Sequence, residues 1–387
     1  MESNKLQKCK QVFNKWLEFD GDDEILDILF AYVLDRKFKG EPLWLWFIVA
    51  SGAMKSTLFR ALRYGASQYT YGLDSFTSKS LMSGKPTAQD VKGQTATSFL
   101  PKINGKVLLI KDLTTILSKD DRERNAIFGQ LRSIYDGYYE AHFGELIDKQ
   151  YCESTFGFIA GVTPIVEIYT KMNQVLGERV LKLRWRGNIE KVTHKASTHK
   201  GKEDELKIEL QSAVSNFFSG LEIKDIEINN EQYVTRIENM AMFLGEARTT
   251  VIPKWNQYGQ IVDCKFEPQP EYPTRIVKNL LKLGKILTCI REKPEFTIKE
   301  LSTLWRITTD SISPYIRWKI LNYLYKNPKP TDALKISEDI HEVYAFVKHR
   351  LEEMKFLKLV NDIEEEGWVI MHPTLDYLDI IHDKKKE

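Results

Sequence analysis

The chain has 387 residues, enough for two or three domains with a sizeable hydrophobic core. Its composition, 42% hydrophobic and 28% charged, is ordinary for a globular protein, and its net charge of +2 excludes a general basic field. Any binding of nucleic acid must therefore come from local patches. The four cysteines form no CxxC pair, which argues against a disulfide framework and a structural zinc site and favours a reducing, cytoplasmic location.

No membrane segment is expected from the sequence. The amino-terminal residues MESNKLQKCKQ lack the apolar core of a signal peptide. The longest apolar run, residues 43–50, is far too short to cross a membrane. Residues 1–40 have apolar side chains at helical spacing, which predicts a short helical lead-in.

Residues 42–62 read PLWLWFIVASGAMKSTLFRAL: an apolar strand at 43–49, a loop of small residues, Lys55-Ser56 and a helix. This layout is that of a phosphate-binding loop, because the amides of a tight loop and of a helix N-terminus favour an anion. A lysine there meets the terminal phosphates, and the hydroxyl that follows it holds Mg²⁺. The residues expected to bind nucleotide are Ser51, Gly52, Ala53, Met54, Lys55, Ser56 and Thr57.

This loop departs from the pattern G-x-x-x-x-G-K-[ST]. Val49 and Met54 occupy the positions of the two glycines, and only Gly52 supplies free backbone rotation. On this stretch alone, a buried strand that leads into a surface helix carrying a lysine is an equally good interpretation.

Residues 106–112, KVLLIKD, predict a second strand that ends in an acid. A carboxylate at such a strand end, the Walker B position, holds Mg²⁺ or polarises the attacking water. Lys111-Asp112 replaces the usual pair of acids, so Asp112 is the single acid available. The alternative is a plain buried strand whose terminal aspartate caps the next turn.

Three further segments predict strands. Residues 69–73 form one candidate, and residues 156–163, FGFIAGVT, form another that ends in Thr163, where a sensor of the γ-phosphate is expected. Between them, residues 122–143 read as an amphipathic helix followed by a turn at Asp136-Gly137. Residues 176–186, LGERVLKLRWR, predict a Gly-Glu-Arg turn that leads into an alternating strand.

Residues 188–205 are polar and predict a loop or linker in which His194 and His199 are solvated. Residues 203–247 return to helical periodicity and are expected to form a helical lid. Residues 249–267 alternate around Tyr258-Gly259 and predict a β-hairpin. In the helix that follows, Pro273 suits the first turn and places Arg275 within it.

From residue 296 onwards, helices are followed by two short strands, at 356–360 and 368–372, around an acidic turn. This is the winged-helix arrangement, a variant of the helix-turn-helix. The helix at 343–354 carries Lys348 and Arg350, which are candidates for contact with DNA, although nearby glutamates repel it. The alternatives are a winged helix that mediates protein contacts and one that only packs on its neighbour.

The order of these features resembles that of the AAA+ ATPases, and among them the minichromosome-maintenance-like helicases of phages and mobile elements. The resemblance covers about residues 40–375. It implies an α/β fold with a P-loop parallel-sheet core, a helical lid and a C-terminal winged-helix domain. The implied divisions are a helical lead-in at 1–40, the core at 41–190, the lid with its hairpin insertion at 191–295, and linker helices with the winged helix at 296–387.

The resemblance also implies a role for each site residue. Lys55 and Ser56 fall on the Walker A lysine and hydroxyl, Asp112 on the Walker B acid, and Thr163 on the first sensor. Ser56 and Asp112 are then the ligands of Mg²⁺.

Two arginines complete the implied site. Arg179 falls on the arginine finger that enters a neighbour's site, and Arg275 falls on the second sensor. For either arginine alone, a surface ion pair is the plainer interpretation. An arginine finger that acts in trans requires a homo-oligomer, here a ring such as a hexamer.

The function implied by the resemblance is ATP hydrolysis with Mg²⁺ by an oligomeric motor or switch that acts on DNA, such as a helicase in the replication or maintenance of a mobile element. The hairpin near Lys254 and Tyr258, together with the winged helix, is expected to grip the DNA. The alternative is a non-hydrolysing assembly or regulatory protein, nucleotide-gated or nucleotide-free, that binds DNA or protein through its winged helix.

Overall fold

The computed structural model describes residues 4–78, 100–141, 150–168, 179–259 and 261–383. The chain divides into two compact units, and each is described by itself. Unit 1 consists of Met1–Glu227 and Lys282–Thr303, and unit 2 consists of Ile228–Leu281 and Leu304–Glu387. The four divisions implied by the resemblance stay predictions.

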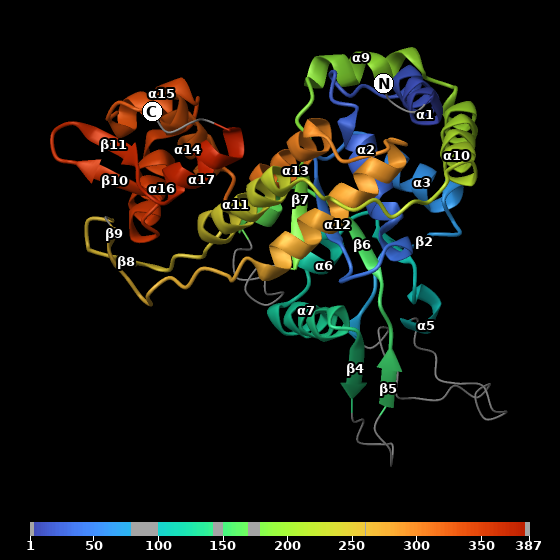
Figure 1. Ribbon diagram of the computed structural model, residues 1–387, viewed down its shortest axis with the longest axis horizontal. Helices are drawn as coiled ribbons and strands as arrows, with labels where there is room; N and C mark the ends of the chain where they lie inside the picture. The colour runs from blue at the N-terminus through green and yellow to red at the C-terminus, as the bar shows by residue number, and fades with distance from the viewer. Residues whose placement is uncertain (1–3, 79–99, 142–149, 169–178, 260, 384–387) are drawn as a thin grey trace. The chain divides into compact units, whose positions relative to one another are not determined.

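Unit 1 contains a five-stranded sheet whose strands are all parallel (Figure 1). The predicted α/β class with a parallel sheet is therefore confirmed. The strands lie in the order β2-β3-β6-β1-β7. Their bounds are β1 Trp44–Ile48, β2 Thr70–Leu73, β3 Val107–Ile110, β6 Gly157–Val162 and β7 Val180–Arg184.

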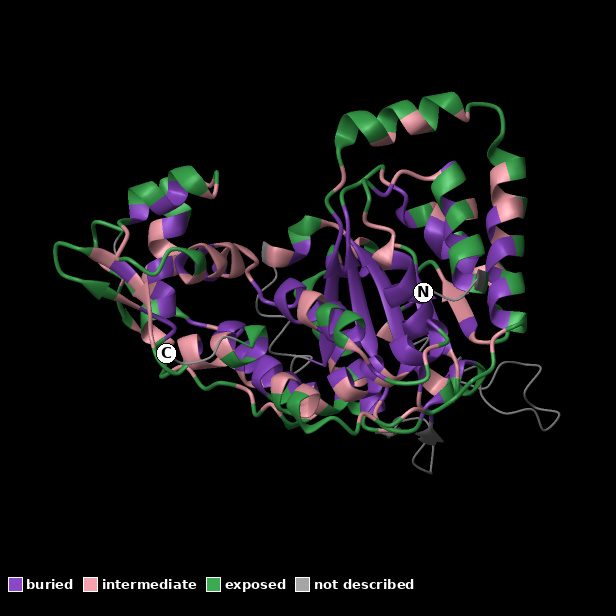
Figure 2. Ribbon diagram, turned by 45° about the horizontal axis from the view of Figure 1, so that its top comes forward, coloured by how far each residue is buried: buried purple, intermediate pink, exposed green. Residues whose placement is uncertain are grey.

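Strand β1 is apolar along its whole length because both faces of the sheet are covered there, and the central strands are coloured as buried in Figure 2. Trp44 and Trp46 belong to a hydrophobic cluster with residues of α6 (Thr114–Leu117) and α7 (Asp121–Tyr135). The rings of Trp44 and Tyr135 meet edge to face, with centroids 5.0 Å apart. The sheet is thus packed on both faces, and the loops that follow its strands are anchored to it.

Helices surround this sheet, and an antiparallel hairpin, β4–β5, is inserted in the chain between α7 and β6. The hairpin was not predicted, because its strands are only four residues long and lack a regular alternation. Its strands are β4 Tyr138–Ala141 and β5 Gln150–Glu153. The other helices of unit 1 are α1 Asn4–Trp16, α2 Glu24–Val33, η1 Asp35–Lys37, α3 Lys55–Gly65, α5 Leu100–Ile103, η3 Pro164–Ile168, α9 Ile189–Thr198 and α10 Glu203–Ser219.

The prediction of a loop at 188–205 is wrong, because α9 forms there. Its N-cap is Asn188, whose side chain accepts a hydrogen bond from the Lys191 amide. The helix buries none of its residues, and its three apolar residues, Ile189, Val192 and Ala196, have helical spacing but are outnumbered by polar ones. It is held to α1 and the following turn by polar contacts, including Lys191 with Asp20 at 2.5 Å.

Strand β7 forms at the predicted place, but its two faces are not alternately buried and exposed. All five residues are buried, including Lys182 and Arg184, which are 5% and 7% exposed. The Lys182 ammonium lies 5.7 Å from the ring centroid of Trp46, and Arg184 pairs with Glu167. An alternation of polar and apolar residues in a strand therefore indicates a solvated face only where no other part of the protein packs over the polar side chains.

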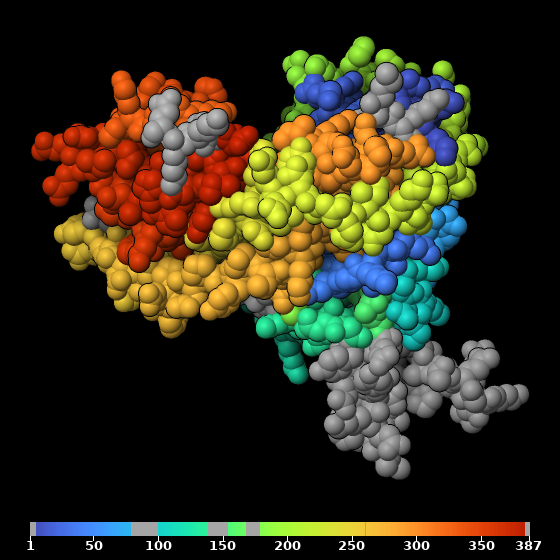
Figure 3. Space-filling model, viewed as in Figure 1, coloured from blue at the N-terminus to red at the C-terminus, as the bar shows by residue number. Residues whose placement is uncertain are grey.

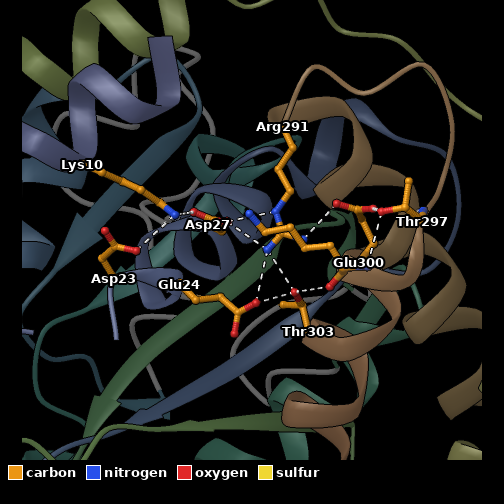
Figure 4. A network of polar contacts seen from close by, with 9 residues as sticks. Lys10, Asp23, Glu24, Asp27, Arg291, Thr297, Glu300 and Thr303 are labelled. Atoms are coloured by element: carbon orange, nitrogen blue, oxygen red, sulfur yellow. Dashed lines mark hydrogen bonds and ion pairs between the residues drawn. The ribbon is translucent and has the colours of Figure 1, made fainter. Parts of the chain in front are cut away.

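A buried network of charges joins the N-terminal helices of unit 1 to residues far along the chain (Figure 4). Arg291 directly follows α12 (Thr274–Ile290), and its guanidinium donates to Asp27 of α2 and to Glu300 of α13 (Ile298–Asp310), at 2.9 Å each. The side chains of all three are 0% exposed. Lys10 of α1 also pairs with Asp27, at 2.6 Å. The helical lead-in is therefore held by a residue 264 positions after Asp27.

Unit 2 is helical, with two antiparallel hairpins. A cluster of aromatic rings lies among its helices, since the Trp305 ring is 5.7 Å from that of Phe243 and 5.3 Å from that of Trp318. The predicted hairpin at 249–267 is confirmed, and Figure 3 shows it beside the C-terminal helices on the surface of the unit. The remaining elements are α11 Glu231–Ala247, β8 Pro253–Trp255, β9 Ile261–Cys264, α14 Ile316–Lys326, α15 Ala333–Asp339, α16 Tyr344–Phe356, β10 Val360–Ile363, β11 Gly367–Ile370 and α17 Thr374–His382.

The first of the two C-terminal strands lies later than predicted. α16 continues to Phe356 because Leu351 and Met354 are buried on its inner face. Lys358 then takes a positive φ of 58°, so β10 begins at Val360 and not at residue 356. The last helix, α17, was not predicted, and it packs against α11.

Candidate functional site

Three strands of the sheet end at the same edge, and each is followed by a predicted site residue. β1 leads into the loop before Lys55, β3 is followed by Asp112, and β6, which lies between β1 and β3, is followed by Thr163. From β1 the chain passes through α3 to β2, the outermost strand on one side of the sheet. From β6 it passes to β7, the outermost strand on the other side. Connections that leave neighbouring strands in opposite directions open a crevice, the usual ligand position in parallel sheets.

The loop between β1 and α3 turns at Gly52, whose φ of +80° favours glycine. Ala50, Ser51 and Gly52 are exposed, whereas Val49 and Met54 are 0% and 6% exposed. The two residues that replace the glycines of the pattern are therefore packed into the protein. Among the described residues, Met54 at the N-cap makes no side-chain hydrogen bond to α3, which leaves the first-turn amides to other acceptors.

Lys55 and Asp112 are brought together across the sheet. Lys55 is the first residue of α3, and its Nζ lies 3.7 Å from Oδ1 of Asp112. The lysine side chain is 8% exposed and that of the aspartate 38%, so the pair is reached from the aspartate side. Ser56 is exposed and Thr57 half-buried at the next two positions. A cation, a hydroxyl and a carboxylate thus belong to one edge of the sheet.

Asp112 is held in place by the backbone that follows it. Its Oδ1 accepts a hydrogen bond from the Thr114 amide at 3.0 Å. Partial burial acts to raise the pKa of Asp112, but the hydrogen bonds from Thr114 and the charge of Lys55 outweigh it and leave that pKa below its usual value. The carboxylate is therefore ionised at neutral pH, as a ligand of Mg²⁺ must be.

Gly161 of β6 is a site residue that was not predicted. A Cβ placed there would lie 2.5 Å from Cδ of Lys55 and 2.4 Å from the carbonyl oxygen of Lys111. Only a glycine leaves room for the lysine stem to cross the strand toward Asp112. The available signal was a glycine inside a buried strand, which marks a close approach of another chain segment.

The structure places Thr163 and Arg179 at opposite edges of the sheet. Thr163 is half-buried directly after β6, at the edge that holds Lys55. Arg179 directly precedes β7, at the other edge, and is 5% exposed. Its guanidinium donates to Asp136 at 3.0 Å and lies 5.2 Å from the ring centroid of Tyr135. The first two residues of the predicted Gly-Glu-Arg turn lie outside the described residues.

The remaining predicted residues belong to unit 2. Arg275 lies in the first turn of α12, 3.5 Å from Glu271. Lys254 pairs with Asp263 across the β8–β9 hairpin at 2.6 Å, and Tyr258 is 78% exposed at its turn.

On α16, Lys348 is half-buried and Arg350 donates to Glu353 at 2.6 Å. Glu353 also accepts from the buried Arg317 at 3.1 Å. This second contact fixes the carboxylate that Arg350 uses, so Arg350 would have to leave an ion pair in order to reach a phosphate.

Comparison with known proteins leaves the site to be interpreted from its geometry. No model of a known protein family matches the sequence, and no curated protein matches it either. Among the described residues, no helix combines the length and the apolar character needed to cross a membrane.

Proposed function

We propose that the chain binds ATP with Mg²⁺ at the crevice beside Lys55 and Asp112 and belongs to the AAA+ class, with the minichromosome-maintenance-like helicases as its nearest resemblance. The observation that carries this proposal is the contact between Lys55 and Asp112 at the carboxyl edge of the sheet, 3.7 Å apart. The two residues are separated by 57 positions and by a strand, so their contact comes from the fold and supports a shared role at this crevice.

Each residue has a chemical task in this proposal. Lys55 neutralises charge on the β- and γ-phosphates, and the exposed loop amides donate to the same oxygens. Ser56 and Asp112 hold Mg²⁺, which when bound neutralises the charge that develops on the phosphates. Thr163 follows the strand between those of Lys55 and Asp112, which supports its assignment as the first sensor.

The position of Arg179 supports an oligomer. It lies at the sheet edge opposite Lys55, away from the proposed nucleotide site of its own chain, where it is 5% exposed and pairs with Asp136. We propose a homo-oligomeric ring in which Arg179 leaves Asp136 and stabilises the transferred phosphoryl group in the next subunit.

We propose that the C-terminal part of unit 2 is a winged helix that contacts DNA. α14, α15 and α16 are followed by the β10–β11 hairpin, and Thr331 forms an isolated antiparallel bridge with Trp368 of β11. This order of three helices and a small sheet supports the assignment. Lys348, Lys254 and Tyr258 are the residues that we assign to DNA contact.

One observation favours the non-hydrolysing alternative. Lys111 stands next to Asp112, so the strand end supplies one carboxylate where two usually share metal binding and activation of water. A protein with this site would bind nucleotide as a switch for assembly without turning it over.

Nucleotide binding and ATP turnover, each measured with and without DNA, test the proposal. Lys55→Ala is expected to abolish both, and Arg179→Ala to abolish turnover alone. A mixture of the two variants should regain part of the activity, because one intact site combines Lys55 from one subunit with Arg179 from the next. Binding without turnover in the wild type would establish the switch, and a wild type that binds no nucleotide would refute both.

A further inference from the structure

A second cavity lies along α3, on the side of β2. It has a volume of about 210 Å³, and three cations line it: Arg60 and Arg63 of α3, and Lys111 after β3. Asp74, after β2, is the only acid among its lining residues. Three positive charges against one negative charge leave a net charge of +2 around a space that is large enough for a phosphate group with part of a sugar.

Two of these three cations have no ion pair among the described residues, and the third has a long and exposed one. Arg60 and Arg63 have no carboxylate partner in the described part of the chain, and Lys111 makes a long ion pair with Asp74, at 3.9 Å, in which both side chains are at least half exposed. Arg63 lies over the ring of Tyr64, 5.5 Å from its centroid. Clustered cations with a surplus of positive charge repel one another, and a bound anion reduces that repulsion.

The backbone aligns the cavity residues. Ser56, Arg60 and Arg63 are spaced by four and three positions, so they follow one face of the helix. Gly72 of β2 gives the stem of Arg63 its path, because a Cβ at that position would lie 2.5 Å from Cδ of Arg63. Tyr64, on the rim of the cavity, is 56% exposed and presents a ring on which a base can stack.

The cavity adjoins the proposed ATP site and shares Ser56 with it, but its three cations are not residues assigned to that site. Lys55 passes over Gly161 of β6 toward Asp112, whereas Arg63 passes over Gly72 of β2, and Arg60 lines the same cavity. We propose that this cavity is a second anion site, which binds a phosphate group of a nucleotide or of single-stranded nucleic acid through Arg60, Arg63 and Lys111. The inference does not rest on ATP binding at Lys55.

The test uses the full chain with Lys55→Ala, so that the loop before α3 contributes no phosphate binding. The affinities of pyrophosphate and of a labelled oligothymidylate of about eight nucleotides are measured as salt is varied. Adding Arg60→Gln and Arg63→Gln should weaken binding at least about tenfold. For the oligonucleotide, the slope of log affinity against log salt should fall by about 1.4, the value for two contacts on a single strand.

Two controls distinguish the loss of a specific binding site from a general loss of positive charge. Arg122→Gln with Arg132→Gln removes two exposed cations from α7 and should change neither affinity by more than about twofold. Gly72→Val keeps every charge but displaces Arg63, and it should weaken binding while the thermal unfolding midpoint shows that the protein still folds.

The two ligands distinguish the source of the phosphate. Loss of affinity for both identifies a site for any phosphate group, and loss for the oligonucleotide alone identifies nucleic acid as the ligand. Unchanged affinities in the arginine variant, or an equal loss in the α7 control, would overturn the proposal. These outcomes can be interpreted even if the protein does not bind ATP at Lys55, because every measurement uses the variant that lacks this lysine.

Discussion

The side chain of Lys55 packs directly over Gly161, so that a Cβ on residue 161 would lie 2.5 Å from Cδ of the lysine. The other close atom, the carbonyl oxygen of Lys111 at 2.4 Å, belongs to the backbone and cannot turn away as a side chain can. The nucleotide site proposed above therefore depends on a residue that touches neither phosphate nor metal.

Gly161→Ala is expected to lower the free energy of unfolding by about 1–3 kcal/mol and to displace Lys55 from Asp112, because the added methyl group overpacks the strand. Urea unfolding and nucleotide affinity measure the two effects. Gly129→Ala is the matched control: nothing lies within 4 Å of a Cβ there, and the position is inside α7. It should stabilise the protein by about 0.5–1 kcal/mol. A tolerated Gly161→Ala with normal affinity would contradict this account of the site.

Arg291→Met is expected to destabilise the protein by about 3–5 kcal/mol, because it leaves Asp27 and Glu300 buried without their shared cation. Chemical denaturation measures the loss. Arg122→Met removes an exposed arginine and should change stability by no more than about 0.5 kcal/mol. If the two variants were equally stable, the network of Figure 4 would not fasten the N-terminal helices.

The pKa of Asp112 predicts how its contribution to stability depends on pH. Because the folded-state pKa lies below the usual value of 3.8, the contribution is fully present above 3.8 and is lost as pH falls through the lower folded value. The difference in unfolding free energy between wild type and Asp112→Asn should therefore stay constant between about pH 7 and pH 5. A difference that already shrinks within that interval would show that Asp112 is not held as a carboxylate by Thr114 and Lys55.

Asn188→Ala is expected to open α9 locally without changing global unfolding, since the helix buries none of its residues. Loss of this cap should cost about 1 kcal/mol, which appears as faster hydrogen exchange in residues 189–198. Asp120→Ala removes the corresponding cap of α7, which buries residues in the main core, so there the global unfolding midpoint should fall. Identical behaviour of the two variants would contradict the distinction.

The sequence by itself determined the layers of unit 1. Its continuous apolar runs predicted the strands of the parallel sheet, because a strand covered on both faces needs no polar alternation, and the loop before Lys55 and the acid at Asp112 were visible as local patterns. The β8–β9 hairpin was equally local, since it is marked by a short alternation around a glycine turn.

Only the tertiary structure decided what covers a polar residue. The alternation at Lys182 and Arg184 predicted a strand, but only the structure shows that Trp46 and Glu167 lie against these side chains. Likewise, only the structure shows that α9 buries none of its residues. In the same way, the strand order brings residues 55, 112 and 161 to one place, although their spacing along the chain says nothing of that distance. The burial of a residue and its distance from another depend on residues far away in sequence, so a local sequence pattern cannot predict them.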